Sequence, residues 1–297
     1  MELSVIIVNY NVKHFLDQCM RTVQQACRNI TAEIIVVDNN SSDGSRDFLE
    51  PLFPSVKFIW NNDNKGFAKA NNQGLALASG DQILFLNPDT ILPEDCIEKS
   101  LRILHANSAI GALGVRMVNG EGKFLKESKR AFPSPTTSFY KLVGLADLFP
   151  RSKTFAKYYL GDLNENENHE IDVLAGAFMM VPREVLNRAG GFDERFFMYG
   201  EDIDLSYRIQ KAGYRNFYFA GTTIIHFKGE STPKASIKQV KIFYQAMSLF
   251  VDKHYRGTKS PLYVFVLKAG IWLRAGVAAT AVFFKRMFRS KDPKQNP

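Results

Sequence analysis

A carboxylate follows directly behind a strongly apolar stretch of the chain. Residues 82–86 read QILFL, and Asn87, Pro88 and Asp89 come next. Pro88 cannot continue the hydrogen-bond ladder of a sheet, so it ends the strand and fixes the turn. The carboxylate of Asp89 then suits a hard cation such as Mg2+ or Mn2+, whose remaining positions substrate phosphates and water would fill. The simpler alternative is that Asp89 caps the following turn.

A histidine and an acidic pair are further candidates for chemistry. His226 ends the apolar stretch TTIIH and precedes Lys228, a residue type that holds phosphate. Its imidazole could complete a metal shell, and a nitrogen donor makes Mn2+ acceptable, although a lone histidine is usually structural. Glu201 and Asp202 open the segment EDIDLSYRIQ, where a general base is one interpretation. The helix dipole alone would also favour acids there, as simple caps.

The elements that must position these groups alternate between strands and helices. Apolar stretches predict strands at residues 3–10, 33–39, 56–61, 82–87 and 110–118. Helical periodicity predicts helices between them, at residues 12–26, 44–52, 66–79 and 93–107. Strands that are apolar on both faces are typical of a parallel sheet covered by helices, in which ligands bind beyond the carboxyl ends of the strands.

The second half of the chain is less regular. Residues 119–170 predict loops, short helices and a flap, followed by a strand and the start of a helix in residues 171–186. A helix ends near Gly213, short strands follow up to His226, and residues 234–255 predict a long helix.

Polar clusters follow four of the predicted strands. They are Asn9–Asn11, Asp38–Gly44, Asn61–Gly66 and Asn87–Asp89. Any one of them alone is typical of a turn or a helix cap. Because the carboxyl ends of parallel strands share one edge of the sheet, the four together predict a binding site there.

Composition bounds the function without fixing it. The chain has 297 residues, 45% apolar and 23% charged, enough for one large or two small globular domains. Its net charge of +8 indicates an anionic partner (nucleic acid, anionic lipid or a phosphorylated substrate) or merely a scattered basic surface. The chain has three cysteines without a CxxC pair and no signal-peptide pattern, which predicts a cytoplasmic protein. It has no uninterrupted run of 18 apolar residues, so no clear membrane span is expected.

The ordered motifs resemble a known family. The chain contains, in this order, SVIIVNYN, VVDNNSSDGS, NKGFAKANNQG, LFLNPDT, GAFMMVPREVL, the EDIDLSYRIQKAGY region and HFKGES. Together these motifs look like the family 2 inverting glycosyltransferases, in the rhamnosyltransferase-like branch, over residues 1–255. The resemblance implies a GT-A fold, a Rossmann-like doubly wound mixed sheet with helices on both faces. It implies a nucleotide-sugar donor and a glycan or lipid-linked glycan acceptor in surface polysaccharide synthesis. UDP and dTDP donors both fit, and the branch favours dTDP-rhamnose.

The same resemblance assigns roles to single residues. Donor contacts are expected at Asp38, Val8, Tyr10, Asn64, Gly66, Asn87 and Lys228, with Asp38 on the base. Asp89 matches the last acid of the family's DxD pattern, and His226 its metal-site histidine; Asn87 replaces the first acid. Asp202 matches the catalytic base, Glu201 its neighbour, and Gly176 and Arg130 lie where the family approaches the acceptor or the phosphates.

The predicted mechanism is a single displacement. Mg2+ or Mn2+, together with Lys228, would stabilise the departing diphosphate while Asp202 deprotonates the acceptor hydroxyl and the anomeric carbon inverts. The alternatives are a sugar nucleotidyltransferase, which would be expected to show a glycine-rich basic loop in place of NYNVKHF, and a nucleotide-sugar-binding protein without catalysis. Nucleic-acid binding is disfavoured, because no basic stripe with stacking aromatics occurs outside the C-terminal helix.

The last part of the chain forms a separate expectation. We expect a glycosyltransferase domain at residues 1–255, with a nucleotide-binding half at 1–118 and an acceptor half at 119–255, and a helical extension and tail at 256–297. On a helical wheel five cations share one face, namely Lys268, Arg274, Lys285, Arg286 and Arg289. Leu262, Phe265, Val266, Trp272, Leu273, Phe283, Phe284 and Phe288 lie opposite. This pattern predicts a helix lying on an anionic membrane at the inner face of the cell membrane; packing on the domain or a homodimer contact is the alternative.

Overall fold

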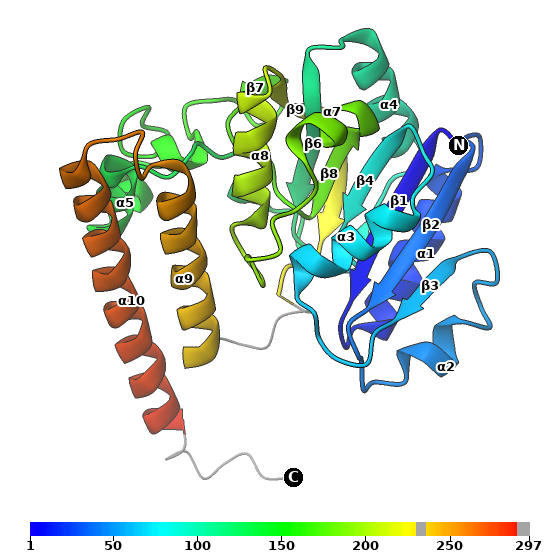
Figure 1. Cartoon of the computed structure of the whole chain (residues 1–297), viewed down its shortest axis with the longest axis horizontal. Coiled ribbons are helices and arrows are strands. Elements are labelled where there is room, and N and C mark those ends of the chain that lie inside the picture. Colours follow the sequence, from blue (N-terminus) through cyan, green and yellow to red (C-terminus); the bar gives the residue numbers. More distant parts are fainter. Residues whose placement is uncertain (230–235, 290–297) are drawn as a thin grey trace.

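The computed structural model describes residues 1–229 and 236–289, without the side chains at 135, 138, 141, 142 and 283–289. A mixed sheet runs through the molecule in the order β3-β2-β1-β4-β8-β6-β9-β5, and β7 pairs with β9 (Figure 1). Its strands are β1 (Leu3–Asn9), β2 (Ala32–Asp38), β3 (Lys57–Trp60), β4 (Gln82–Leu86), β5 (Thr90–Ile91), β6 (Ile110–Val118), β7 (His169–Ile171), β8 (Phe178–Pro182) and β9 (Arg215–His226).

The first four strands are parallel, as their doubly apolar pattern predicted. β1 pairs with β2 and β4, and β2 pairs with β3, so that Asn9 and Asp38 lie in register at neighbouring strand ends. β8 then runs antiparallel to β4 and β6, which makes the sheet mixed. The short strands expected before His226 form one strand, β9, whose register with β6 shifts between Val115 and Arg116. This irregularity bends a long strand rather than dividing it.

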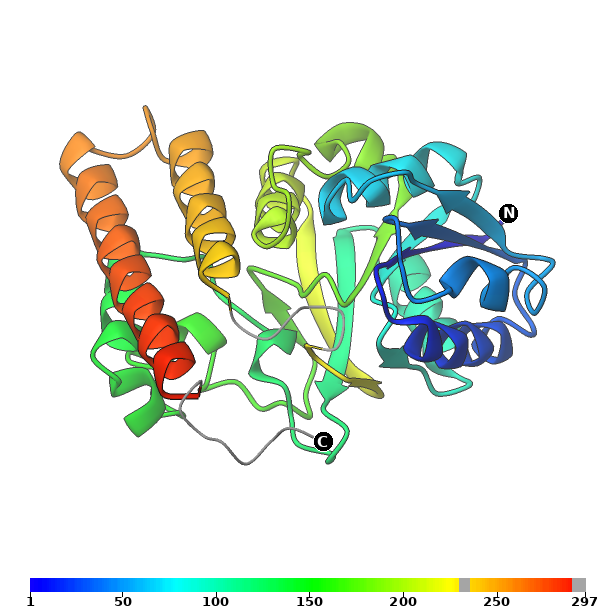
Figure 2. The same cartoon turned by 90° about the horizontal axis from the view of Figure 1, so that it is seen from below.

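Helices cover both faces of the sheet (Figure 2). One hydrophobic cluster joins the inner faces of α1 (Lys13–Ala26), α2 (Ser45–Leu49) and α4 (Cys96–Ala106) to β1, β2 and β4. A second cluster joins α3 (Phe67–Leu77), α7 (Arg183–Ala189) and α8 (Glu201–Lys211) to the opposite face. Residues 119–170 form short pieces, as expected: η1 (Lys126–Ser128), α5 (Pro135–Leu142), α6 (Leu145–Leu148) and η2 (Lys157–Tyr159).

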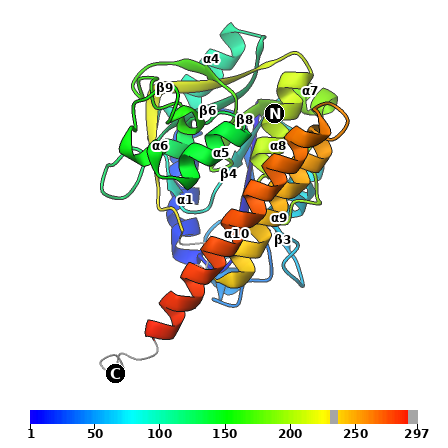
Figure 3. The ribbon, with the colours of Figure 1, turned by 90° about the vertical axis from the view of Figure 1, so that its left-hand side faces the viewer.

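Two long helices lie beside the sheet, α9 (Ile237–His254) and α10 (Pro261–Arg289), and they run next to each other (Figure 3). Phe250, Val251 and Leu267 are buried in a cluster that they share with Ile203 of α8. Asp204 of α8 is fully buried and accepts from His254 at 2.7 Å, and Lys253 lies 2.7 Å from the same carboxylate. The helix pair is therefore fixed to α8, the helix that carries the expected catalytic acids.

α10 departs from the expected amphipathic arrangement in one respect. Lys268, expected on an outward basic face, pairs with Asp252 of α9 at 2.8 Å, and Arg274 lines a pocket between the helices. Both cations therefore turn toward the protein. The opposite face is exposed at Leu262, Phe265 and Leu273, by 71%, 69% and 61%. The side chains of Lys285, Arg286, Arg289, Phe283, Phe284 and Phe288 lie outside the described residues.

Among the described residues, one helix could span a membrane by its length and composition. It is the part of α10 from Pro261 to Val282, with a mean hydropathy of 1.5 and 11% of its most apolar stretch buried. The sequence predicted no clear span because Lys268 and Arg274 interrupt this stretch.

Candidate active site

The Asn-Pro-Asp turn after β4 is fixed from several sides. The backbone amide of Asn87 donates to the Ala177 carbonyl at 3.0 Å. The Asn87 carbonyl accepts from the Thr90 hydroxyl at 2.8 Å and from the Cys19 thiol at 3.6 Å. Burial raises the pKa of Cys19 to about 12, so this thiol stays a neutral donor. The strand therefore stops at Pro88 in a turn whose backbone is held by both the sheet and α1.

A two-residue strand brings the two expected metal ligands together. Thr90 pairs with His226 in the antiparallel pairing of β5 with β9, and the Phe227 amide donates to the Asp89 carbonyl at 2.8 Å. As a result the His226 Nε2 lies 3.3 Å from the Asp89 Oδ1, with both side chains almost fully buried. The side-chain nitrogen Nδ2 of Asn87 lies 3.3 Å from the same Nε2. The sequence could suggest each residue but not this contact.

The donor set fits a divalent ion that shares its shell with a substrate. Two ligands at right angles on an ion with bonds of about 2.1 Å lie about 3 Å apart, close to the separation of Asp89 and His226. No group of three His, Cys, Asp or Glu side chains suited to a metal occurs within the described ranges. A site with one carboxylate and one imidazole therefore needs further oxygen ligands, and Mg2+ or Mn2+ commonly takes these from phosphates and water.

Lys228 lies just beyond this pair. Its ammonium is 2.5 Å from the Glu127 carboxylate of η1, and its side chain is 61% exposed. Burial works to raise the pKa of Glu127, but the hydrogen bond and charge of Lys228 lower it overall. Lys228 is thus tethered beside the Asp89–His226 pair at the surface, where it can exchange Glu127 for an anionic ligand.

The loops expected to hold the nucleotide are cross-linked by side-chain amides. The side-chain amide of Asn9 donates to the Asp38 carboxylate at 2.6 Å. The other Asp38 oxygen accepts from the backbone amide of Ser41 at 2.8 Å. Asn39 donates to the Gly66 carbonyl at 3.1 Å. Asp38, expected to contact the base, is buried with only 3% exposed. The sequence placed Asn9 and Asn39 in the polar clusters predicted to form a binding site, but it gave neither residue a role of its own.

Gly66 is required by its surroundings. Its φ is +83°, and a Cβ added there would lie 2.5 Å from the Phe197 carbonyl oxygen. The Phe67 amide donates to that same oxygen at 2.7 Å, so the start of α3 is held against the loop that precedes α8. Asn64 supports the turn, because its side chain accepts from the Gly66 amide at 2.9 Å. The nucleotide-side and acceptor-side loops therefore meet at Gly66.

The other two expected donor contacts differ in burial. Val8 is 7% exposed and packs in a small cluster with Val37 and Ala70, so its side chain is part of the core. Tyr10 follows β1 and is half-buried at the same edge of the sheet. A contact between Val8 and a ligand would therefore be made by its backbone.

Asp202 lies at the centre of a buried ion pair. Its carboxylate accepts from Arg130 at 2.6 Å, with side-chain exposures of 15% and 11%. The same oxygen accepts from the Gly176 amide at 3.3 Å, and the other accepts from the Ile203 amide at 2.8 Å. Burial works to lower the pKa of Arg130, but Asp202 raises it overall, so the guanidinium stays charged. The three residues assigned separately from the sequence thus form one group.

The neighbouring acids have different environments. Burial, and after it the charge of Asp202, raise the pKa of Glu201 to about 8, so this carboxyl is largely protonated at neutral pH. Asp204 is fully buried and paired with Arg208, Lys253 and His254. Asp202 is therefore the acid of this helix start that is both paired with Arg130 and placed beside Gly176.

One short segment joins the two parts of the site. The backbone amide of Asn87 donates to the Ala177 carbonyl, and the backbone amide of the adjacent Gly176 donates to the Asp202 carboxylate. Gly176 also faces Phe67, since a Cβ added there would lie 3.7 Å from that ring. The metal-type pair, Asp202 and the start of α3 therefore meet around Gly176 and Ala177.

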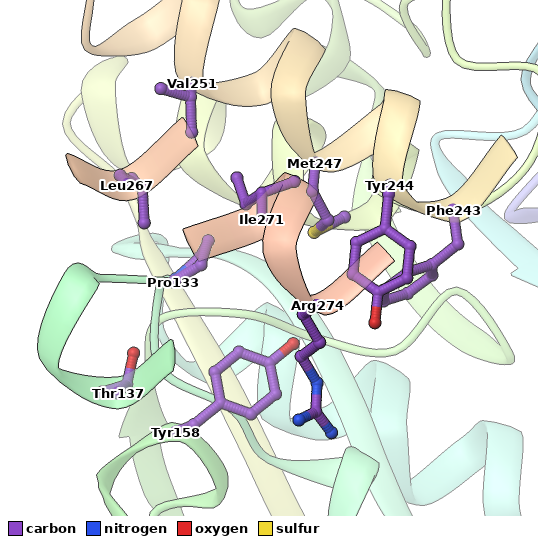
Figure 4. A pocket seen from close by; sticks show the side chains of 10 residues that line it. All are labelled: Pro133, Thr137, Tyr158, Phe243, Tyr244, Met247, Val251, Leu267, Ile271 and Arg274. Atoms are coloured by element: carbon purple, nitrogen blue, oxygen red, sulfur yellow. The ribbon is translucent and has the colours of Figure 1, made fainter. Parts of the chain in front are cut away.

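A pocket lies on the acceptor side, between α9, α10 and the segment that carries Tyr158 (Figure 4). It is lined by Pro133, Thr137, Tyr158, Phe243, Tyr244, Met247, Val251, Leu267, Ile271 and Arg274. Tyr158 also hydrogen-bonds Arg130, the partner of Asp202. The sequence did not single out Tyr158, which lies in an irregular segment without periodicity.

The match to a protein family decides the class of the chain. The model of glycosyl transferase family 2 matches residues 4–190. The chain belongs to this family. It is a glycosyltransferase, as the ordered motifs predicted, rather than the sugar nucleotidyltransferase that was the alternative. The residues assigned to the site lie partly within the match and partly beyond it, since Glu201, Asp202, His226 and Lys228 follow residue 190.

Relatives of this family 2 glycosyltransferase include enzymes of glycan assembly. An N-acetylglucosaminyl-diphospho-decaprenol L-rhamnosyltransferase of Mycobacterium tuberculosis is 26% identical over 92% of this chain and 91% of its own length. A low-salt glycan biosynthesis hexosyltransferase of Haloferax volcanii is 27% identical over 71% of this chain and 62% of its own. The first supports the rhamnosyltransferase-like branch.

Solved structures support the GT-A fold. A mannosyltransferase from Pyrobaculum calidifontis, in complex with GDP-Man and Mn2+, superposes with a TM-score of 0.57 at 20% identity, covering 98% of this chain and 76% of that one. TarS of S. aureus, in complex with UDP-GlcNAc, superposes with a TM-score of 0.56 at 17% identity, covering 92% and 72%. The predicted GT-A fold with a mixed sheet and a C-terminal helix is confirmed.

Proposed function

We propose that this chain is an inverting, metal-dependent glycosyltransferase that moves a sugar from a nucleotide-sugar donor to a hydroxyl of a lipid-linked glycan. The observation that carries the proposal is the segment Gly176–Ala177. It binds the Asn-Pro-Asp turn on one side and Asp202 on the other. A donor diphosphate at the first and an acceptor hydroxyl at the second would be neighbours.

The donor side would be held by the loops at the ends of β1 to β4. Asp38 and Asn64 fix the two loops between which a nucleotide would lie, and Tyr10 borders them. Asp89 and His226, with Asn87 beside them, would hold Mg2+ or Mn2+, which supplies positive charge to the leaving diphosphate. Lys228 would leave Glu127 and add a second positive charge there.

The chemical step would use Asp202. Its carboxylate takes the proton of the acceptor hydroxyl while that oxygen attacks the anomeric carbon from the face opposite the diphosphate. The C–O bond to the diphosphate breaks as the glycosidic bond forms, so the anomeric configuration inverts without a covalent sugar intermediate. Arg130 and Gly176 keep the Asp202 carboxylate oriented toward the acceptor. Glu201, protonated beside it, adds no competing charge.

The mycobacterial relative guides the choice of substrates. Its name specifies a rhamnosyl donor and an acceptor in which a sugar is joined through a diphosphate to a polyprenol. We infer a dTDP- or UDP-sugar donor, with dTDP-rhamnose first, and an acceptor of that lipid-linked class in surface polysaccharide synthesis.

A lipid-linked acceptor would place the protein at the cytoplasmic side of the membrane. Leu262, Phe265 and Leu273 expose an apolar face of α10, and Lys268 is turned away from it into an ion pair. Such a face suits burial at the boundary of headgroups and acyl chains. Exposed Arg256 and Lys259 line a groove with Trp272 near the start of α10, which suits anionic headgroups.

The test of the catalytic assignment is Asp202→Asn, with Asp95→Asn, at the exposed residue directly before α4, as a matched control. We expect Asp202→Asn to lower transfer by roughly 100-fold or more, in the range of lost general-base catalysis, while the dissociation constant of the donor is unchanged. Product NMR should show inverted anomeric configuration, and removing divalent ions should stop transfer. Turnover by Asp202→Asn equal to that of Asp95→Asn would disprove the role.

A further inference from the structure

The pocket between α9, α10 and Tyr158 has an unusual combination of walls. Most of its lining is apolar or aromatic, including Met247, Val251, Leu267 and Ile271. One cation, Arg274, lies at the wall formed by α10, and its side chain extends toward Tyr158 (Figure 4). An apolar cavity with one placed charge suits a ligand that joins a hydrocarbon to an anion.

Arg274 is the cation in this region that remains available for an anion. Lys268, on the same helix, is neutralised by Asp252, and Lys253 is neutralised by Asp193 and Asp204. Arg274 makes no ion pair with any described carboxylate, and it lies beside the hydroxyl of Tyr244, whose pKa burial raises. A guanidinium beside hydroxyl groups is well suited to bind phosphate oxygens.

The pocket is connected to the proposed catalytic acid through a short series of contacts. Tyr158 lines the pocket and hydrogen-bonds Arg130, and Arg130 pairs with Asp202 at 2.6 Å. A ligand held at Arg274 therefore lies on the acceptor side of Asp202, and not at the strand ends where the donor loops meet. On its other side the pocket is walled by α10, the helix with the exposed apolar face.

We propose that this pocket is the subsite for the diphosphate and first isoprene units of a lipid-linked acceptor. Arg274, with the hydroxyls of Tyr158 and Tyr244, binds the diphosphate. The apolar walls at Met247, Leu267 and Ile271 cover the start of the hydrocarbon chain. The inference deepens the proposed function and rests on it for the identity of the acceptor, but its binding chemistry can be tested without a transfer reaction.

The test is equilibrium binding of farnesyl diphosphate to the full chain in detergent. EDTA is present, so that no metal recruits the diphosphate to the donor side. We expect saturable binding to the wild type, weakened at least tenfold in Arg274→Gln and also weakened in Ile271→Phe, which fills the cavity. Lys241→Gln is the control, because it removes an exposed cation of α9 that does not line the pocket and should bind like the wild type.

Component probes separate the sources of affinity. Farnesol should bind more weakly than farnesyl diphosphate, and its binding should be insensitive to Arg274→Gln; inorganic diphosphate should bind more weakly than both. No binding of farnesyl diphosphate to the wild type, or equal binding by Arg274→Gln and Lys241→Gln, would overturn the subsite. Loss of the subsite with intact sugar transfer would leave the proposed function standing. Failure of transfer with every nucleotide sugar would overturn that function instead.

Discussion

Replacing Arg130 with methionine gives the sharpest test of how the acceptor side is built. Arg130 and Asp202 are 11% and 15% exposed and 2.6 Å apart, so each charge is largely removed from water and stabilised by the other. Arg130→Met keeps a long apolar side chain but leaves the Asp202 carboxylate buried without its cation. Removing one partner of such a pair typically costs about 3–5 kcal/mol of unfolding free energy.

The measurement is urea unfolding at pH 7, followed by tryptophan fluorescence. With a slope of about 2–3 kcal/mol per molar urea, the expected loss moves the midpoint of Arg130→Met down by roughly 1–2 M. Arg215→Met is the matched control, because the Arg215–Glu170 pair is exposed by 57% and 56%. Such surface pairs contribute about 0–1 kcal/mol, so the control midpoint should move little.

A double-mutant cycle distinguishes the ion pair from a simple packing defect. Asp202→Asn removes the buried negative charge, so Arg130→Met should cost much less in that background, with a coupling energy of roughly 1–3 kcal/mol. Additive effects within about 0.5 kcal/mol would refute the account, as would Arg130→Met being as stable as Arg215→Met.

Three further predictions concern other parts of the molecule. Because the pKa of Glu201 is raised from 4.5 to about 8, its contribution to stability is full below pH 4.5 and lost as the pH rises to 8. Glu201→Gln should therefore flatten the decline in the urea midpoint between pH 5 and 9. A decline as steep as that of the wild type would contradict this assignment. Gly66→Ala should unfold more easily than Gly122→Ala, which shares a positive φ but meets open space, and should also weaken donor binding; equal midpoints would argue against the contact with Phe197. Phe265→Glu with Leu273→Glu should release the protein from anionic vesicles in a flotation assay, and undiminished binding would dismiss the membrane face.

The sequence predicted those features that depend on local pattern. Alternating apolar strands and periodic helices placed Asp38 and Asp89 at strand ends, because a doubly apolar run has few alternatives to a covered parallel strand. The division of the chain into units at 118 and 255 stays a prediction. The merging of the short strands before His226 into β9 was missed, since the small and polar residues around Gly221 look like a turn but form an irregularity in one strand.

The contacts within the site could not be predicted, because they join distant parts of the chain. Asn87 and His226 are separated by 139 positions and meet only through the short pairing of β5 with β9. Arg130 and Asp202 are separated by 72. The residue types alone gave no reason to prefer Asp202 to Asp204, since both begin the same helix; the family resemblance made that choice. The distinction comes from α9, whose cations neutralise Asp204 and leave Asp202 to Arg130.

The helical-wheel argument for α10 expected Lys268 and Arg274 on an outward basic face, but both cations turn toward the protein. Positions two apart on a helix differ by about 200°, so Trp272 and Arg274 point in nearly opposite directions. Trp272 is 46% exposed on the outer face, and Arg274 lines the inner pocket. A helical wheel cannot show which face packs against protein. A cation can pack against α9 when Asp252 or the Tyr244 hydroxyl lies beside it. Lys268 lines a groove with Phe265 and Trp272 at the edge of the outer face, but Asp252 neutralises it, so the proposed membrane and ligand contacts use different faces of one helix.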